Sequence, residues 1–192
     1  MNAAERTLGG EPLPSDIPAE QAVLGAILLS ADVARSLLPL LRAEQFYRPA
    51  HGELLGVMHH LHDRRQPVDP LTVHAELRRR GRLQFGERNA AVVLHDLLSA
   101  TPTVANARYY AALVTEAAVR RRAIEAGVRL VQLAGAGHGD VDELMSDAIR
   151  EVARVRTAVE YHHALTRSTR EQAAAAPAER PLRAVGDSGD GR

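Results

Sequence analysis

The sequence predicts an all-α protein, in which a compact multi-helix head is followed by a long antiparallel helical hairpin. Hydrophobic residues make up 45% of the 192 residues, but aromatic residues only 3%. An aliphatic, alanine-rich core of this kind favours helix packing over a β-sandwich. Apolar residues also recur at helical spacing through most of the chain. Both observations point to helices packed against helices.

Four regions follow from these patterns. Residues 1–16 are polar and contain two glycines and two prolines, so we expect a flexible N-terminal segment. Residues 17–103 form the predicted head and residues 104–162 the predicted hairpin. Residues 163–192 have little to bury, and we expect them to be a mostly disordered tail.

Three helices are predicted in the first half of the head. Ser15 and Asp16 are N-cap candidates and Pro18 fits a first turn, so the first helix begins near residue 17. A second, short helix covers residues 32–41, and a third begins near Pro49. His51 lies on the apolar face of this third helix, and no nucleophile or paired carboxylate accompanies it in sequence. We therefore interpret His51 as a hydrogen-bonded core histidine rather than a base or a ligand.

The fourth helix of the head is predicted to begin with Asp69 as N-cap and Pro70 at its first position. It ends around Gly81 in an arginine run: Arg78, Arg79, Arg80 and Arg82. Such a run could grip phosphates or an acidic partner. It also has a structural interpretation, because cations stabilise a helix C-terminus by about 0.3 to 1 kcal/mol each. We favour the structural interpretation and keep the four arginines as a candidate partner contact.

A fifth helix over residues 89–99 closes the head, and the helical pattern then becomes much longer. Residues spaced three or four apart between Ala107 and Val131 follow one face of a helix of about thirty residues. This is far above the typical helix length in globular proteins. After a glycine turn at residues 135–139, apolar residues alternate at spacings of four and three, the period of a packed seam. These residues are the candidate partner-binding seam: Val141, Met145, Ala148, Val152 and Val155. Two long helices joined by a short turn form an antiparallel hairpin.

Three consecutive arginines, Arg120, Arg121 and Arg122, lie inside the first hairpin helix. Their side chains point about 100° apart, so they cannot form one basic face, and at least one must approach the apolar seam. We interpret them as long stems that cover apolar surface while their heads stay in water, in preference to a partner or DNA contact.

Short motifs along the chain have the order found in a known family. They are Glu20-Gln21-Ala22-Val23-Leu24-Gly25, Phe46-Tyr47-Arg48-Pro49-Ala50-His51, Pro67-Val68-Asp69 and Thr101-Pro102-Thr103. In this order the sequence resembles the N-terminal domain of the bacterial replicative DNA helicase family, DnaB. The resemblance implies a helical collar domain, which a separate ATPase domain follows in that family. It also implies that the hairpin pairs with another subunit, giving dimers that build the collar of a hexamer.

Composition argues against catalysis by the chain itself. The sequence contains no lysine, so it has no Gly-x-x-x-x-Gly-Lys phosphate loop, and we expect no enzymatic activity and no cofactor. It contains no cysteine, and although His59 and His62 could share a helix face, no further zinc ligands accompany them. The 24 basic and 24 acidic residues balance, so we expect nucleic-acid binding to be weak or indirect.

Two functional hypotheses remain. In the first, the chain is a stand-alone interaction module linked to DNA replication, which binds itself and, in addition, a replicative helicase, a primase or a helicase loader. In the second, it is the N-terminal part of a replicative helicase whose unwinding motor is missing from this chain. A third hypothesis, direct DNA binding by the arginine runs, lacks a recognition helix. The sequence shows no export signal and no apolar run of about 20 residues, so we expect a cytoplasmic protein that does not enter membranes.

Overall fold

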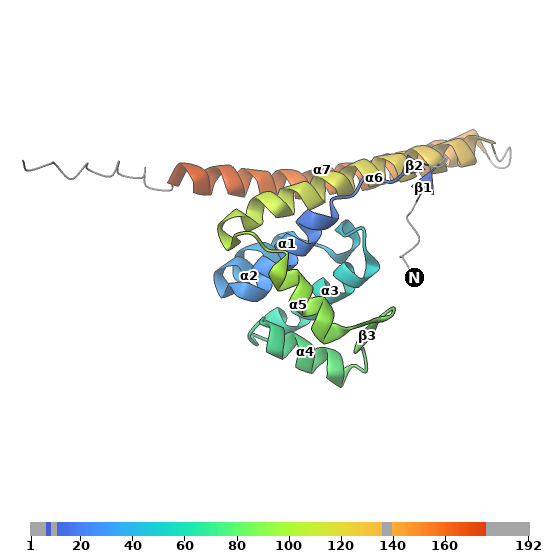
Figure 1. Cartoon of the computed structure of the whole chain (residues 1–192). Helices are drawn as coiled ribbons and strands as arrows, with labels where there is room; N and C mark the ends of the chain where they lie inside the picture. Colours follow the sequence, from blue (N-terminus) through green and yellow to red (C-terminus); the bar gives the residue numbers. More distant parts are fainter. Residues whose placement is uncertain (1–6, 9–10, 136–139, 176–192) are drawn as a thin grey trace, which may run out of the picture.

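Two long helices, α6 (Ala107–Gly135) and α7 (Val141–Ala175), lie side by side across one face of a cluster of shorter helices (Figure 1). The computed structural model describes residues 7–8, 11–135 and 140–175. The predicted all-α class is confirmed, and so is its division into a head and a hairpin of two antiparallel helices. The glycine turn expected at residues 135–139 lies mostly outside the described residues.

The shorter helices make up the head. In chain order they are α1 (Ile17–Leu29), α2 (Ala31–Leu37), α3 (Pro49–Asp63), α4 (Pro70–Arg79) and α5 (Ala90–Ser99), with the single 3-10 turns η1 (Leu38–Leu40), η2 (Ala43–Gln45) and η3 (Val104–Asn106). The starts of α1 and α4 follow the predicted caps. The Asp16 carboxylate accepts a hydrogen bond from the Ala19 amide at 2.9 Å, and the Asp69 carboxylate accepts from the amides of Leu71 and Thr72. Local side-chain chemistry therefore sets where these helices begin.

Two short pairs of antiparallel strands accompany the helices in the part of the chain that the structure describes. Strand β1 (Thr7–Leu8) pairs with β2 (Glu11–Pro12) inside the segment expected to be flexible, and residues 1–6 and 9–10 lie outside the described residues. Strand β3 (Gln84–Phe85) pairs with β4 (Arg88–Asn89) in antiparallel register. Gly86, with φ +64°, forms the turn of the second hairpin, because glycine adopts the left-handed conformation without steric cost. The sequence analysis did not predict either pair.

Helix α1 lies at the centre of the head. Nine of its thirteen residues are buried, including Leu24 and Ile27, because α2, α3, α5 and α6 all pack around it. One close approach is to α5. A methyl group added at Gly25 would lie 2.2 Å from the Leu97 carbonyl oxygen and 2.1 Å from the Thr101 hydroxyl. Glycine at this position therefore allows the two helices to touch through their backbones.

A buried carboxylate joins three parts of the head. Glu20 of α1 is only 1% exposed, and its carboxylate accepts hydrogen bonds from the amides of Tyr47 and Arg48 at the start of α3. The Nδ1 atom of His51 lies 2.7 Å from the same carboxylate. The interpretation of His51 as a hydrogen-bonded core histidine is thus confirmed. Glu20, which the sequence analysis did not single out, is its partner.

Arg121 overturns the expectation that the hairpin arginines keep their heads in water. Its side chain is 4% exposed, and its guanidinium donates hydrogen bonds to the carbonyl oxygens of Pro14 and Gln45, both at 2.7 Å. The guanidinium also lies over the Tyr47 ring, 5.6 Å from its centroid. Arg120, by contrast, is largely exposed and pairs with Glu116 on the same helix. The acceptors are backbone carbonyl oxygens close to α6, and the sequence analysis did not take such acceptors into account.

Helix α7 continues beyond residue 162, where the sequence analysis placed the end of the hairpin. Leu165 is fully buried as part of the head's core, and the Tyr161 ring packs under the guanidinium of Arg42 at 5.1 Å. Residues 163–175 are therefore helical rather than part of a disordered tail. Burial of Leu165 and the high helix propensity of alanine at residues 173–175 account for the difference. The rest of the expected tail lies outside the described residues.

Candidate interaction surface on the hairpin

Helix α7 has an inner face that packs on α6 and the head. The residues on this face are separated by steps of four and three: Leu144, Ala148, Glu151, Val155, Ala158, His162 and Leu165. Cross-helix contacts of Glu151 with Arg129 and of His162 with Thr115 fix the orientation of α7. Residues three or four positions from these two share their side of the helix. The inner face is thus the seam that closes the hairpin.

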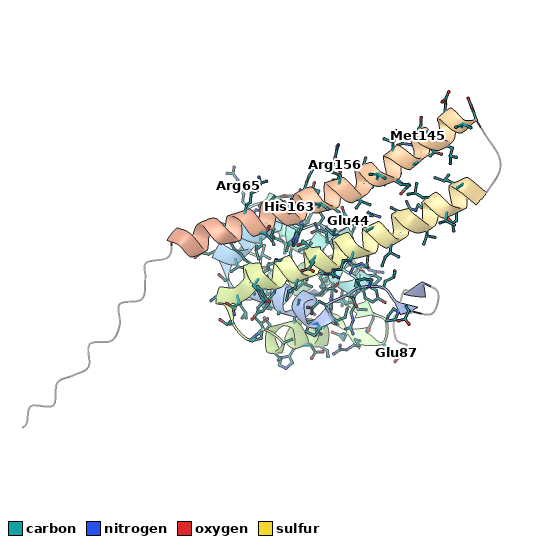
Figure 2. The ribbon with its side chains drawn as sticks, turned by 90° about the horizontal axis from the view of Figure 1, so that it is seen from above. Glu44, Arg65, Glu87, Met145, Arg156 and His163 are labelled. Carbon is teal, nitrogen blue, oxygen red and sulfur yellow. The ribbon has the colours of Figure 1, made fainter. Side chains whose placement is uncertain are left out.

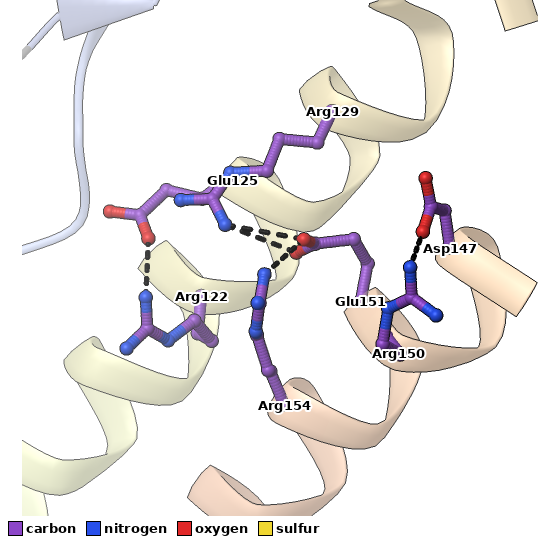
Figure 3. A network of polar contacts seen from close by, with 7 residues as sticks. All are labelled: Arg122, Glu125, Arg129, Asp147, Arg150, Glu151 and Arg154. Atoms are coloured by element: carbon purple, nitrogen blue, oxygen red, sulfur yellow. Dashed lines mark hydrogen bonds and ion pairs between the residues drawn. The ribbon is translucent and has the colours of Figure 1, made fainter. Parts of the chain in front are cut away.

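Glu151 is the polar centre of this inner face. Its carboxylate lies 3.2 Å from the Arg129 guanidinium of α6 and also pairs with Arg154, one turn further along α7 (Figure 3). Burial alone would raise the pKa of Glu151, but the hydrogen bonds from the two arginines outweigh it, so its pKa lies below the usual value. A second pair, Asp147 with Arg150, stands next to it. These charges are engaged within the hairpin.

His162 closes the inner face near the head. Its Nδ1 atom lies 2.9 Å from the Thr115 hydroxyl, which itself donates to the carbonyl oxygens of Ala111 and Ala112 in α6. Burial lowers the pKa of His162. A neutral imidazole is therefore favoured at this contact, where it can donate its Nδ1 proton to the hydroxyl.

A second face of α7, the outer face, carries a stripe of exposed apolar side chains beside the inner face. Its four members are Val141, Met145, Ile149 and Val152, exposed by 73%, 58%, 61% and 57%. Figure 2 shows Met145 close to the loop end of the hairpin. On α6, Val131 is exposed as well. Contiguous exposed apolar surface of this kind is typical of a protein–protein contact.

The predicted seam therefore divides between the two faces. Val141, Met145 and Val152 belong to the exposed outer face, whereas Ala148 and Val155 belong to the inner face and are half-buried. Ile149, which completes the outer stripe, was not among the predicted residues. A step of four from Met145 to Ile149, in place of the step of three to Ala148, would have identified it.

The arginine run at the end of α4 is largely paired within the chain. Glu76 lies 2.7 Å from the Arg79 guanidinium and 2.6 Å from that of Arg80. Hydrogen bonds from Arg79 and then Arg80 lower the pKa of Glu76 to about 2. Arg82 forms a bidentate pair with Glu53 of α3 at 2.6 Å, and Arg78 is exposed.

The described residues hold no sign of a metal or membrane site. Among residues 7–8, 11–135 and 140–175, no three or more His, Asp or Glu side chains are placed to hold a metal ion. None of the helices in the same ranges combines the length and the apolar character that a membrane span needs.

Residues 12–116 match the family model for the DnaB-like helicase N terminal domain. This range contains the whole head and the start of α6. The chain belongs to the DnaB-like helicase N-terminal domain family. The resemblance that the short motifs indicated is thereby confirmed.

Curated relatives of the DnaB family extend the similarity into α7. The replicative DNA helicase DnaB of Mycobacterium leprae is 45% identical over 157 residues, which cover 79% of this chain and 26% of the relative. The DnaB of Leifsonia xyli is 38% identical over 142 residues, 74% of this chain and 31% of the relative. The chain thus spans about a quarter to a third of the length of these relatives.

A solved structure shows the same fold. The crystal structure of the N-terminal domain of DnaB helicase from Mycobacterium tuberculosis aligns with a TM-score of 0.66 and 44% sequence identity. The alignment covers 74% of this chain and 99% of the solved one. The two proteins therefore share a fold over the aligned part of this chain.

Proposed function

We propose that this DnaB-type domain acts in DNA replication as a protein-interaction module that self-associates through the outer face of α7. The observation that carries this proposal is the stripe of Val141, Met145, Ile149 and Val152, which stays exposed although the inner face of the same helix is packed. Burying such a stripe against a second subunit removes apolar surface from water at about 25 cal/mol per Å². Membership of a helicase family supports the link to replication.

Further partners follow from the same family relationship. The assembled domain binds a replicative helicase, a primase or a helicase loader in the cytoplasm. The arginine run of Arg78, Arg79, Arg80 and Arg82 is a second candidate surface, for an acidic partner or a phosphate. Because Glu76 and Glu53 already engage three of the four arginines, any contact with nucleic acid is weak and steeply salt-dependent.

An alternative function rests on the lengths of the relatives. The domain covers only 26% and 31% of two relatives that are named as replicative helicases. In this alternative it is the N-terminal part of such a helicase, and the ATP-dependent unwinding motor lies outside these residues. The chain itself offers no lysine for a phosphate-binding loop, so in either case it does not hydrolyse ATP on its own.

Sedimentation equilibrium of the purified chain at tens of micromolar tests self-association. Dimers or larger species are expected, and a strictly monomeric chain would overturn the proposed surface. Co-elution with a full-length replicative helicase of the same host tests the partner. An antibody against the head, applied to a host lysate, separates the two functional alternatives. A band at the mass of the chain, 20.8 kDa, supports the separate module, and a band about two to three times larger supports the helicase fragment.

A further inference from the structure

We infer that a hollow between the two helices of the hairpin binds a pyrophosphate group through three arginines, Arg129 of α6 and Arg150 and Arg154 of α7. The hollow has a volume of about 390 Å³. This volume lies in the range of about 300 to 1,000 Å³ that is usual for small-molecule sites. The inference goes beyond the proposed self-association, because it concerns a different side of α7.

Three guanidinium groups border this hollow from two helices (Figure 3). Arg129 reaches it from α6, and Arg150 and Arg154 reach it from positions one turn apart on α7. Their side chains are 45%, 63% and 52% exposed, so a solute can contact them without any opening of the hairpin. Arginine suits a phosphate ligand, because its planar guanidinium donates two parallel hydrogen bonds to phosphate oxygens.

Each guanidinium keeps donors that the hairpin does not use. Within the described part of the chain, Arg129 and Arg154 each bind Glu151 through one terminal nitrogen, and Arg150 binds Asp147 through one terminal nitrogen. A guanidinium has five N–H donors in all. A pyrophosphate group can therefore accept hydrogen bonds from the three arginines while their pairs with the two carboxylates stay in place.

The charge of the lining also favours an anion. Three arginines stand against two carboxylates, Asp147 and Glu151, so the lining carries one excess positive charge in a chain whose formal net charge is zero. An exposed site with this small excess holds a singly charged anion weakly, because salt screens the attraction. Pyrophosphate carries several negative charges on neighbouring oxygens and can contact more than one guanidinium at a time.

The rest of the lining indicates that phosphates alone are recognised. Gln132 and Leu133 complete the described residues around the hollow, and none of these residues has an aromatic ring on which a nucleotide base would stack. Free pyrophosphate and the pyrophosphate group of a nucleotide are therefore equivalent ligands for this site.

The hollow and the apolar stripe lie on opposite sides of α7. Arg150 and Arg154 are each two residues from Val152, which places them about 160° around the helix from it. A subunit that covers the stripe therefore does not have to cover the hollow. Pyrophosphate that contacts both α6 and α7 binds only the folded hairpin and so stabilises it.

Calorimetric titration of the full chain with sodium pyrophosphate at low salt tests the site. We expect Arg150→Gln and Arg154→Gln each to weaken binding about ten-fold, because each removes charge-assisted hydrogen bonds. Neither substitution touches the contact between Arg129 and Glu151, so the hairpin is kept, and circular dichroism checks this. Arg156→Gln is the matched control. It removes the same charge from α7 outside the hollow and should change the affinity by less than about two-fold.

A substitution of opposite sign gives a second, independent measurement. Asp147→Asn removes one of the two carboxylates in the lining and should strengthen pyrophosphate binding about three-fold. Asp142→Asn changes the charge of the whole chain equally but lies outside the lining, so it should leave the affinity nearly unchanged. Equal effects of the two substitutions would show a general attraction of the chain for anions and would overturn the site.

Further outcomes decide the ligand. An unmodified chain that does not bind pyrophosphate, or whose binding Arg154→Gln and Arg156→Gln weaken equally, overturns the inference. ADP should bind within about three-fold of pyrophosphate, and binding at least about ten-fold tighter would contradict recognition of the phosphates alone. Single-stranded DNA that binds more tightly than pyrophosphate at these arginines would make the hollow a nucleic-acid contact instead. Val152→Asp should abolish self-association and leave pyrophosphate binding intact, so the failure of one proposal is distinguishable from the failure of the other.

Discussion

The guanidinium of Arg121 donates a 2.7 Å hydrogen bond to the backbone carbonyl of Gln45, 76 residues earlier in the chain. A second hydrogen bond of the same length reaches the carbonyl of Pro14. One side chain of the hairpin thereby holds the start of the head and the segment before α3. Tyr47 connects this contact to the pair of Glu20 and His51, because its ring lies below the guanidinium and its backbone amide donates to the Glu20 carboxylate.

Truncating Arg121 should therefore destabilise the protein. We expect Arg121→Ala to lower the free energy of unfolding by about 3 kcal/mol, because buried carbonyl groups lose charged donors. Arg120→Ala removes only an exposed pair and should change the free energy by less than about 0.5 kcal/mol. Urea unfolding of both variants, followed by circular dichroism, gives the comparison. Equal effects would show that Arg121 does not join the head to the hairpin.

The contact of α1 with α5 predicts that alanine substitutions at two glycines change the stability of the protein in opposite directions. Gly25→Ala should cost at least about 2 kcal/mol, because its methyl group would meet a backbone carbonyl that cannot move aside. Gly56→Ala in α3 has no atom within 4 Å of the new methyl group and should stabilise the helix by about 0.5 to 1 kcal/mol. Thermal unfolding of the two variants measures the difference. A harmless Gly25→Ala would mean that the helices do not touch as described.

Arg65 offers a position where the native residue is conformationally strained. It follows the end of α3 with φ +56°, and the Gln66 amide donates to the Leu61 carbonyl across it. Arg65→Gly should raise the free energy of unfolding by about 0.5 to 1 kcal/mol, because glycine adopts this left-handed conformation readily. Arg64→Gly, at φ −85°, should bring no gain. Chemical denaturation that ranks Arg64→Gly above Arg65→Gly would contradict this account.

Local chemistry was sufficient to predict the helices and several of their ends. Asp69 caps the helix that it was expected to cap, Asp16 is the one of two candidates that caps α1, and Gly81 has φ +67° just beyond α4. Each of these features depends on residues within one helical turn of one another. The period of apolar residues likewise predicted the long helices of the hairpin, because a helix repeats its environment along its own sequence.

Contacts between distant segments could not be predicted in this way. The burial of Arg121 depends on the backbone carbonyl groups of Pro14 and Gln45. Every residue has such a group, so the residue types in the sequence do not reveal this contact. The predicted seam of α7 combined residues of two different faces for a related reason. Spacings of three and four both fit a helix, and only the position of α6 decides that Ala148 lies inside while Ile149 lies outside.

Glu76 predicts a pH dependence of stability. Hydrogen bonds from Arg79 and Arg80 lower its pKa from the usual 4.5 to about 2 in the folded protein. Because the folded pKa is the lower one, the stabilisation is fully present above about pH 4.5 and is lost as the pH falls towards 2. The unmodified chain should therefore be more stable than Glu76→Gln at pH 6, and this difference should shrink at pH 3. Urea unfolding at the two pH values is the measurement, and a constant difference would disprove the linkage.

The two faces of α7 predict that a valine-to-aspartate substitution has different effects on each face. Val152 is exposed on the outer face, so Val152→Asp places its charge in water in the lone chain and leaves thermal unfolding nearly unchanged. In the self-associated protein the same charge is buried against apolar side chains without a partner, and association should weaken by at least about ten-fold. Val155 is half-buried against α6, so Val155→Asp should instead lower the unfolding temperature of the hairpin itself. Sedimentation and thermal unfolding, measured on both variants, separate the two effects. If Val152→Asp unfolds the chain, or if it associates as strongly as the unmodified protein, the outer face is not the surface through which this domain assembles.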